Sequence, residues 1–538
     1  MTSFVRAALS HFLSHNKNDR FMDEARIPAL RVTQAAFDIA LGCALFAAPL
    51  FMGGRGPLGK FVFIVFVSCM AAAWLVEWWL RPAKHRVVRW TGAEWIIGGG
   101  LLLVVAQLLP LPESILLTIS PHMRDLLPIW FPSSDPQHHQ IGQWQTISFA
   151  PDATRHALAV YLSYGLFFFL IVQRIQRVTD AERLLRWIAY GAIGLSVIGM
   201  AQFLFGNGKF LWVYEHPFRA TERVVKGPFQ NQNHFAQMMA LSIGPLLWLL
   251  LGYLRSTRSE DHRSARSKRQ GRRSHRGRQH PAPSFRSGSP SELLPLPFYV
   301  TAFGTGLIAT SVMLTYSRGG FLAFVVAAAT ALAIFAWQRS GSRRFWISVA
   351  CTASVVFVSV LIHGYDTLTN RLATLGESES LEELSVGRHS LWNAMAEAIS
   401  LYWRGGTGFG SHADVYPLFM NEHYSVRFTH GESGYLPLFM EGGIFAIALL
   451  VASILLFLYW IWNIAGARHH QHPEANHITP FTAPLAAAIM ASLVHSIGDF
   501  VWYITAPMSW TILMLAVAAS VAGIARQTTT NNQPSQVR

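Results

Sequence analysis

The sequence predicts an all-α polytopic membrane protein with about twelve transmembrane helices, and three observations support this fold class. First, 51% of the residues are hydrophobic and only 13% are charged, about half the charged share of an ordinary soluble domain. Second, apolar runs of about twenty residues, long enough to cross a bilayer, recur along the whole chain. Third, the short alternating segments of a transmembrane barrel are absent, so backbone polar groups in lipid must be satisfied within helices.

The apolar runs fix the expected domain organisation. The expected spans are 34–53, 58–79, 93–111, 155–173, 185–206, 234–254, 296–316, 319–337, 345–362, 436–461, 483–504 and 507–524. They define an N-terminal tail (1–33), helices one to six (34–254), a basic loop (255–295), helices seven to nine (296–362), a large loop (363–435), helices ten to twelve (436–524) and a C-terminal tail (525–538). The basic loop is rich in Arg, Ser and Pro, a composition typical of disorder.

The distribution of the positive charge sets the orientation. With a cytoplasmic N-terminus and loops on alternating sides, about 30 of the 43 Lys and Arg residues fall in the cytoplasm. Both tails are therefore expected in the cytoplasm. The net charge of +14 then reflects topology, and no nucleic-acid partner is implied. The cysteines lie within predicted helices, so neither a disulfide framework nor a thiolate metal site is expected.

The polar motifs fall on the outer side of the membrane. KGPFQNQNHFA (226–236) leads into a helix. Arg318 lies at the tip of the hairpin between two expected spans, and the hairpin is so short that Arg318 is held near the depth of the lipid headgroups. GRHSLWNAMAEAISLYWRGGTGFG (387–410) predicts an amphipathic helix that ends in a glycine-rich turn. HGESGYLPLFMEGG (430–443) follows just before the tenth span. Their agreement indicates an outer active site, which must use an already activated donor because no ATP is present there.

These motifs also have structural interpretations. Arg318 could snorkel to the interface, and His430 could be an ordinary loop histidine. Asn231, Asn233 and His234 could serve helix capping and turn formation. The GGTGFG stretch lacks the strand–turn–helix context of a nucleotide fingerprint, so a turn is expected.

Two further clusters contain ionisable side chains. His495 and Asp499 are four residues apart in the expected span 483–504 and should share one helix face, where a structural or supporting role is favoured over direct chemistry. His412, His423 and His430 share the large loop with carboxylates, but their spacing matches no familiar ligand pattern. We therefore expect neither a metal nor a cofactor.

The motifs, taken as an ordered set, resemble the O-antigen ligase and O-antigen polymerase superfamily of bacterial inner-membrane glycosyltransferases. The similar segments are TISFAPDATRHAL (146–158), KGPFQNQNHFA (226–236), TYSRGGFLAF (315–324), GRHSLWNAMAEAI (387–399), GGTGFGS (405–411), HGESGYLPLFMEGG (430–443) and HSIGDFVWYITAP (495–507). They occur in the family's order over roughly residues 146–507.

This resemblance implies a metal-independent, inverting transfer at the periplasmic face of the inner membrane. The implied donor is an undecaprenyl-diphosphate-linked glycan, and the acceptor is lipid A–core or a lipid-linked glycan. The family's catalytic histidine corresponds to His430, and its diphosphate-binding arginines correspond to Arg318 and Arg388. Residues expected to support the site are Lys226, Asn231, Asn233, His234, Glu432, Glu441, His495 and Asp499. The family commonly has Asn after its histidine, whereas this sequence has Gly431.

The residue chemistry agrees with this assignment. The guanidinium fork of arginine matches phosphate oxygens bidentately, and a neutral imidazole can accept the proton of an attacking sugar hydroxyl. The ordinary histidine pKa predicts that His430 titrates at about pH 6.5, or at a higher pH if Glu432 contacts the ring.

Three other functions were considered. A polymerase uses the same donor as a ligase, and the ligase is favoured without an acceptor signature to decide between them. A transporter or flippase would carry midplane polar residues or broken helices with repeat symmetry. A purely structural scaffold leaves the outer motifs unexplained.

The predicted topology can be checked directly. Reporter fusions at residues 270 and 470 should signal cytoplasm, and fusions at 130 and 400 should signal periplasm, because Lys and Arg concentrate in cytoplasmic loops. A periplasmic signal from residue 270 would separate the polar motifs onto two faces and contradict the outer site.

Overall fold

No strand is present among the residues that the computed structural model describes, which are 28–83, 86–127, 144–216, 221, 224–274, 294–338, 379–421, 428–467 and 475–530, with isolated helical positions between 343 and 354. Nine of the described helices are long and apolar enough to cross a membrane. They are Pro28–Leu50, α2 (Pro57–Leu80), α5 (Pro151–Arg174), α6 (Val178–Phe205), the Gln232–Arg255 part of α7 (Gln232–Ser274), α8 (Leu296–Met313), α9 (Arg318–Trp337), α14 (Tyr435–Gly466) and Thr505–Thr528 of α17 (Thr505–Thr530). The prediction of an all-α polytopic membrane protein is confirmed.

Helices outside the nine candidate spans complete the described chain. Two are apolar, namely α3 (Ala93–Leu108) and the segment Thr479–His495, which joins η6 (Thr479–Phe481) to α16 (Thr482–His495). The others are η1 (Met52–Gly54), α4 (Glu113–Ile119), η3 (Pro121–Asp125), α12 (Glu379–Tyr402), α13 (His412–Val415), η4 (Tyr416–Phe419), α15 (Ala475–Ile478) and η7 (Val501–Tyr503). The expected span 345–362 lies largely outside the described residues.

Small residues bring α7, α9 and α16 close together. Every fourth residue is a buried alanine on α9 (Ala323, Ala327, Ala331) and on α16 (Ala483, Ala487, Ala491), and the two rows share one apolar cluster. A Cβ added to Gly244 of α7 would lie 2.8 Å from Cα of Pro484. Close backbone approach of this kind drives helix association in lipid, where apolar side chains alone provide little preference.

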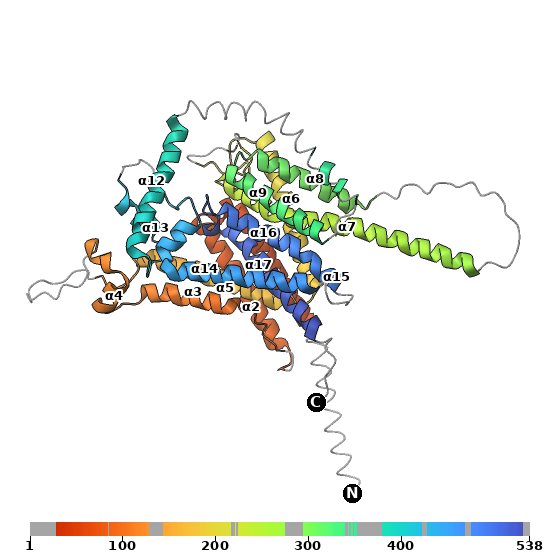
Figure 1. Ribbon diagram of the computed structural model, residues 1–538, viewed down its shortest axis with the longest axis horizontal. Helices are drawn as coiled ribbons and strands as arrows, with labels where there is room; N and C mark the ends of the chain where they lie inside the picture. Colours follow the sequence, from red (N-terminus) through yellow and green to blue (C-terminus); the bar gives the residue numbers. More distant parts are fainter. Residues whose placement is uncertain are drawn as a thin grey trace, which may run out of the picture.

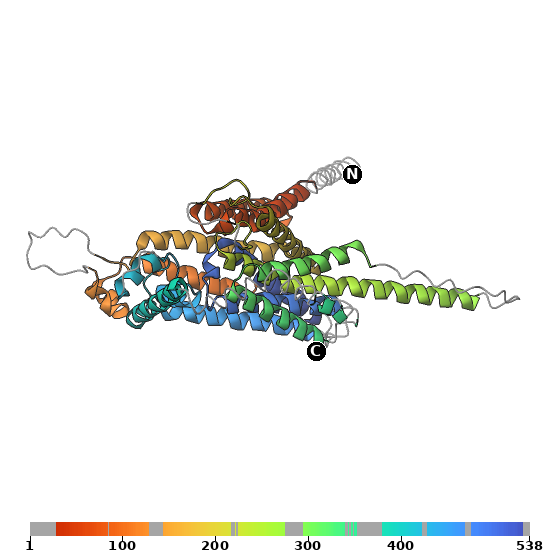
Figure 2. The same ribbon diagram turned by 90° about the horizontal axis from the view of Figure 1, so that it is seen from above.

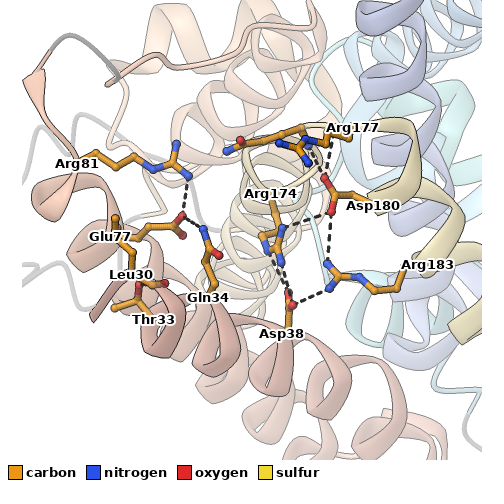
Figure 3. Close-up of polar contacts among 11 residues, drawn as sticks. Leu30, Thr33, Gln34, Asp38, Glu77, Arg81, Arg174, Arg177, Asp180 and Arg183 are labelled. Carbon is orange, nitrogen blue, oxygen red and sulfur yellow. Dashed lines mark hydrogen bonds and ion pairs between the residues drawn. The ribbon is translucent and has the colours of Figure 1, made fainter. Parts of the chain in front are cut away.

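Ion pairs fasten the first helix to α5 and α6 (Figure 3). Asp38 accepts two hydrogen bonds from Arg174, at 3.0 and 2.9 Å, and one from Arg183 at 3.0 Å. Asp180 bonds the backbone N–H of Arg177 at 3.0 Å and lies 3.7 Å from Arg174. A bidentate arginine–carboxylate pair fixes orientation as well as distance, so this cluster sets how the three helices meet.

The two ends of the bundle carry different elements (Figures 1 and 2). Helices α4, α12 and α13 gather at one end, which we call the site end. The C-terminal part of α7 projects from the opposite end, beyond the other helices.

The long α7 and the short α16 differ from expectation. The backbone of 255–274, expected to be disordered, continues α7 as a helix. Extending an existing helix avoids the cost of nucleation, so even a polar sequence can follow it. The expected span 483–504 instead ends at His495, where the helix gives way to a turn and to η7.

Candidate active site

His430 lies at the site end, just before α14, with its ring packed on an aromatic side chain. Its imidazole is nearly parallel to the ring of Phe500, with centroids 4.3 Å apart and planes 13° apart. Tyr503 meets the imidazole edge-on at 6.3 Å. The two loops that supply these residues are joined because Gly434 N–H donates to Ser496 O at 2.7 Å. The turn that follows His495, where the expected span 483–504 was to continue, therefore supplies the ring on which His430 packs.

The surroundings of His430 favour its neutral form. Burial, followed by the charges of Arg55 and Lys60 and by His234 and His412, lowers its pKa well below the ordinary histidine value. The structure therefore favours a pKa of His430 below the ordinary value from which titration near pH 6.5 was expected. Its Nδ1 lies 3.0 Å from Oγ1 of Thr429, which leaves Nε2 as the nitrogen that can face a substrate.

Glu432 contacts an arginine in the described structure. Arg388 on α12 donates to its carboxylate at 2.9 Å. Burial raises the pKa of Glu432, while the charge of Arg388 opposes that rise. On the same helix, the Trp392 indole N–H donates to the carbonyl of Gly431 at 3.1 Å. α12 is thus fastened to the two residues that follow His430, Gly431 and Glu432.

Asp499 and His234 form a buried acid–histidine pair, and His234 lies against Phe500. Asp499 is 3.4 Å from Nε2 of His234 and accepts a hydrogen bond from the Asn233 amide at 2.6 Å. His234 also meets the Phe500 ring edge-on at 5.0 Å. A buried charge needs such partners, so the start of α7 and the turn after α16 depend on each other.

The expected helix-face pairing of His495 with Asp499 is wrong. α16 ends at His495, and Asp499 lies in the following turn. The ring of His495 instead bonds the side chain of Gln237 on α7 at 2.8 Å. Both side chains are still buried, so the supporting position of each is retained.

The glycine-rich stretch 405–410 is a turn that repairs a break in α14. Gly443 has a φ of +61°, outside the helical range, which releases carbonyls in the preceding turn. Thr407 N–H donates to Met440 O at 2.9 Å, and Gly408 N–H donates to Glu441 O at 3.0 Å. The buried Glu441 carboxylate accepts from the backbone N–H of His412 at 3.2 Å. Glu441 therefore supports the break and anchors α13.

The remaining predicted residues have neighbours of their own. Arg318, the first residue of α9, is exposed. Its neighbour Gly319 packs on His495, because a Cβ added to Gly319 would lie 3.3 Å from Nε2 of His495. Lys226 is buried, with its ammonium 5.0 Å from the centre of the Phe210 ring. Asn231 accepts a hydrogen bond from Asn233 N–H at 2.9 Å, which is the turn chemistry of a helix start.

Sequence reasoning missed several residues that complete the site, chiefly Arg55, Thr429 and Phe500. Arg55 donates to Thr429 Oγ1 at 3.0 Å, and its guanidinium carbon lies 5.5 Å from the Phe500 ring centre. A signal existed, because Arg55 stands between two glycines in the short loop that joins the first two expected spans. The missing information was the contact across 374 positions, which no local pattern encodes.

Metal ligation is not apparent in the described part of the chain. No group of three or more His, Cys, Asp or Glu residues there is arranged to hold an ion. His412 stacks on Tyr416 with ring centres 5.0 Å apart, and burial lowers its pKa to about 4. His423 lies outside the described residues.

The departure from Asn at position 431 has a steric reason that can be measured. A Cβ on Gly431 would lie 2.4 Å from Cγ of Pro437 and 2.9 Å from Sδ of Met395. We expect Gly431→Ala to lower the free energy of unfolding by about 1–3 kcal/mol, the usual effect of overpacking. Thermal unfolding in detergent would measure it. Gly498→Ala is the matched control, because no atom lies within 4 Å of a Cβ added to Gly498. Equal stability of the two variants would contradict the tight packing around Gly431.

Part of the chain matches a known protein family. Residues 303–464 match the family model described as O-antigen ligase, and no curated protein matches the chain. The matched region contains Arg318, Arg388, His430, Glu432 and Glu441. The remaining supporting residues, including His234 and Asp499, lie outside it. The match shows that residues 303–464 are similar to the O-antigen ligase family, which supports the expected superfamily.

Proposed function

We propose that this protein transfers a glycan from undecaprenyl diphosphate to a sugar hydroxyl at the periplasmic face of the bacterial inner membrane, with lipid A–core as the acceptor. The observation that carries the proposal is the position of His430, a histidine kept neutral by burial and by neighbouring cations. A neutral imidazole is the form that accepts a proton. Cations around it suit an anionic diphosphate.

In the proposed reaction, the acceptor hydroxyl attacks the anomeric carbon of the donor glycan. The new C–O bond forms as the bond from that carbon to the diphosphate oxygen breaks, which inverts the configuration. Nε2 of His430 takes the hydroxyl proton, since Nδ1 faces Thr429. Undecaprenyl diphosphate leaves with the electron pair of the broken bond. General-base help of this kind contributes roughly 10²–10⁴ in rate.

The arginines are assigned to the leaving group. Arg318 is exposed at the start of a membrane-spanning helix, where the diphosphate of a membrane-embedded donor would lie. Arg388 donates to Glu432 through Nη2, and a guanidinium has further N–H groups that can bond phosphate oxygens. Charge-assisted bonds to the leaving diphosphate stabilise the negative charge that builds on it.

The role of Arg318 predicts a graded loss. Arg318→Ala should lose most transfer activity, and Arg318→Lys should recover only part, because a point charge cannot reproduce the guanidinium fork. Arg388→Ala should behave similarly. Transfer is measured with purified protein in vesicles, a defined lipid-linked donor and lipid A–core. Wild-type donor turnover by Arg318→Ala protein that inserts normally would rule out its role at the diphosphate.

The role of His430 predicts a loss of roughly 100-fold or more in His430→Ala, the scale of lost base catalysis. Because the pKa of His430 is lowered, the imidazole of the empty enzyme stays neutral as the pH falls through the usual histidine range. The kcat/KM of the wild type should therefore stay flat from about pH 8 to about pH 5.5, since kcat/KM reports the free enzyme. A chelator such as EDTA should leave activity unchanged.

Two outcomes would move the chemistry elsewhere. One is full activity in His430→Ala, and the other is loss of activity in chelator with rescue by one divalent ion. The acceptor is tested separately in a deletion strain. Full-length lipid-linked glycan should accumulate if the protein is a ligase, whereas single repeat units would indicate a polymerase.

A further inference from the structure

Arg55 is held beside the candidate site by a rigid turn. Gly53 and Gly54 have φ values of +75° and +73°, which strain other residues. The turn is fastened because Thr505 Oγ1 donates to Gly54 O at 3.0 Å. It is also tightly packed, since a Cβ on Gly53 would lie 2.5 Å from Cδ1 of Phe229. The backbone that precedes Arg55 therefore has little freedom to move away from the site.

The side chain of Arg55 reaches His430 through one hydroxyl group. Nη2 of Arg55 donates to Oγ1 of Thr429 at 3.0 Å, and the same oxygen lies 3.0 Å from Nδ1 of His430. A guanidinium has no acceptor, so the hydroxyl oxygen must accept from Arg55. A second lone pair of that oxygen can accept from Nδ1–H. In the tautomer that carries Nδ1–H, this contact leaves Nε2 free to act as the base; in the other tautomer the Thr429 hydroxyl donates its own proton to Nδ1.

The charges around His430 are unusual for a general base. A carboxylate commonly orients a catalytic histidine and stabilises its protonated form. Among the described residues, the charge that acts most strongly on His430 is that of Arg55, and the described acids of the neighbouring elements have other partners. Glu432 pairs with Arg388, and Asp499 pairs with His234 and Asn233. Glu441 interacts with Tyr503 and with the charge of Lys60, and His412 is buried beside Tyr416.

We propose that Arg55 is a third cation for the donor diphosphate and, through Thr429, a positioning residue for His430, so that an anionic diphosphate strengthens the base when it binds. This inference rests on the proposed function of the site. The charge of Arg55 opposes protonation of His430. A bound diphosphate offsets that charge. An opposite charge at close range changes a pKa by about one to three pH units, so proton acceptance becomes favourable only beside a donor.

The first test measures donor binding without requiring transfer. Farnesyl diphosphate in detergent micelles is the probe, and the full-length protein is used. Arg55→Gln should raise its Kd by about tenfold, the effect of losing one charge-assisted hydrogen bond. Arg55→Lys should recover part of the affinity because it keeps the charge. Thr429→Val keeps Arg55 and should bind the probe within about twofold of the wild type, yet its kcat should fall because the imidazole is no longer fastened.

The second test compares two pH profiles of transfer. The profile of kcat/KM reports the free enzyme and that of kcat reports the donor-bound enzyme. In the wild type, the midpoint assigned to His430 should lie at least about one pH unit higher in kcat than in kcat/KM. Arg55→Gln should reduce this gap, which is the difference between the two pH midpoints, because it should raise the midpoint of the kcat/KM profile. Arg404→Gln is the matched control, because Arg404 is an exposed cation of the same outer region that bonds Thr118 O at 2.8 Å. It should leave both the gap and the Kd unchanged.

The possible outcomes separate this inference from the proposed function. If Arg55→Gln binds farnesyl diphosphate as tightly as the wild type and keeps the full gap, Arg55 has no role at the donor, although transfer by His430 still stands. If the wild-type protein does not bind the probe, the diphosphate assignment itself fails. If Arg55→Gln does not fold, Arg55→Lys and Thr429→Val decide, and wild-type kinetics in both would overturn the proposal.

Discussion

The site depends on one aromatic ring at the end of a broken helix. Phe500 lies under the imidazole of His430, meets His234 edge-on and lies 5.5 Å from the guanidinium carbon of Arg55. The ring can occupy this place only because α16 stops at His495. Irregular backbone at membrane depth must have its polar groups satisfied by protein. Here Ser496 O accepts from Gly434 N–H, and the Asp499 side chain is held by the start of α7.

A second broken helix contributes to the same end of the bundle. α14 is interrupted at Gly443, and the glycine-rich turn after α12 bonds the carbonyls that the interruption releases. The Gln107 amide also donates to Glu441 O at 2.8 Å. These bonds fix the direction of the first turns of α14 and hence the loop that carries His430. Both interruptions thus position the loop that carries His430 and the ring on which it packs.

The fold class could be predicted because local composition alone indicates a membrane span. An apolar run of twenty residues has few alternatives in lipid, and the amphipathic α12 and its terminal turn have equally local signals. The end of α16 could not be predicted in this way. The segment after His495 remains apolar, so hydropathy gives no sign that Asp499 lies in a turn. The helical continuation of α7 was missed for a related reason, because polar composition alone does not exclude a helix that extends an existing one.

The candidate site was only partly predictable for a different reason. His430, Arg388 and Glu432 belong to motifs, and their residue types indicate proton transfer and anion binding. Arg55 and Phe500 reach the site across long stretches of chain, and an arginine or a phenylalanine in a loop is common. The pKa of His430 was also out of reach, because burial and cations from other elements determine it.

The central claim is that His430 and the arginines act on a single lipid-linked donor at the site end. The most direct measurement is an experimental structure of the full-length protein with a non-transferable glycosyl-diphosphate lipid. The account predicts phosphate oxygens within about 3 Å of the guanidinium groups of Arg318 and Arg388, and an anomeric carbon that faces Nε2 of His430. A diphosphate bound at the opposite end of the bundle, or a donor glycan out of reach of His430, would contradict it.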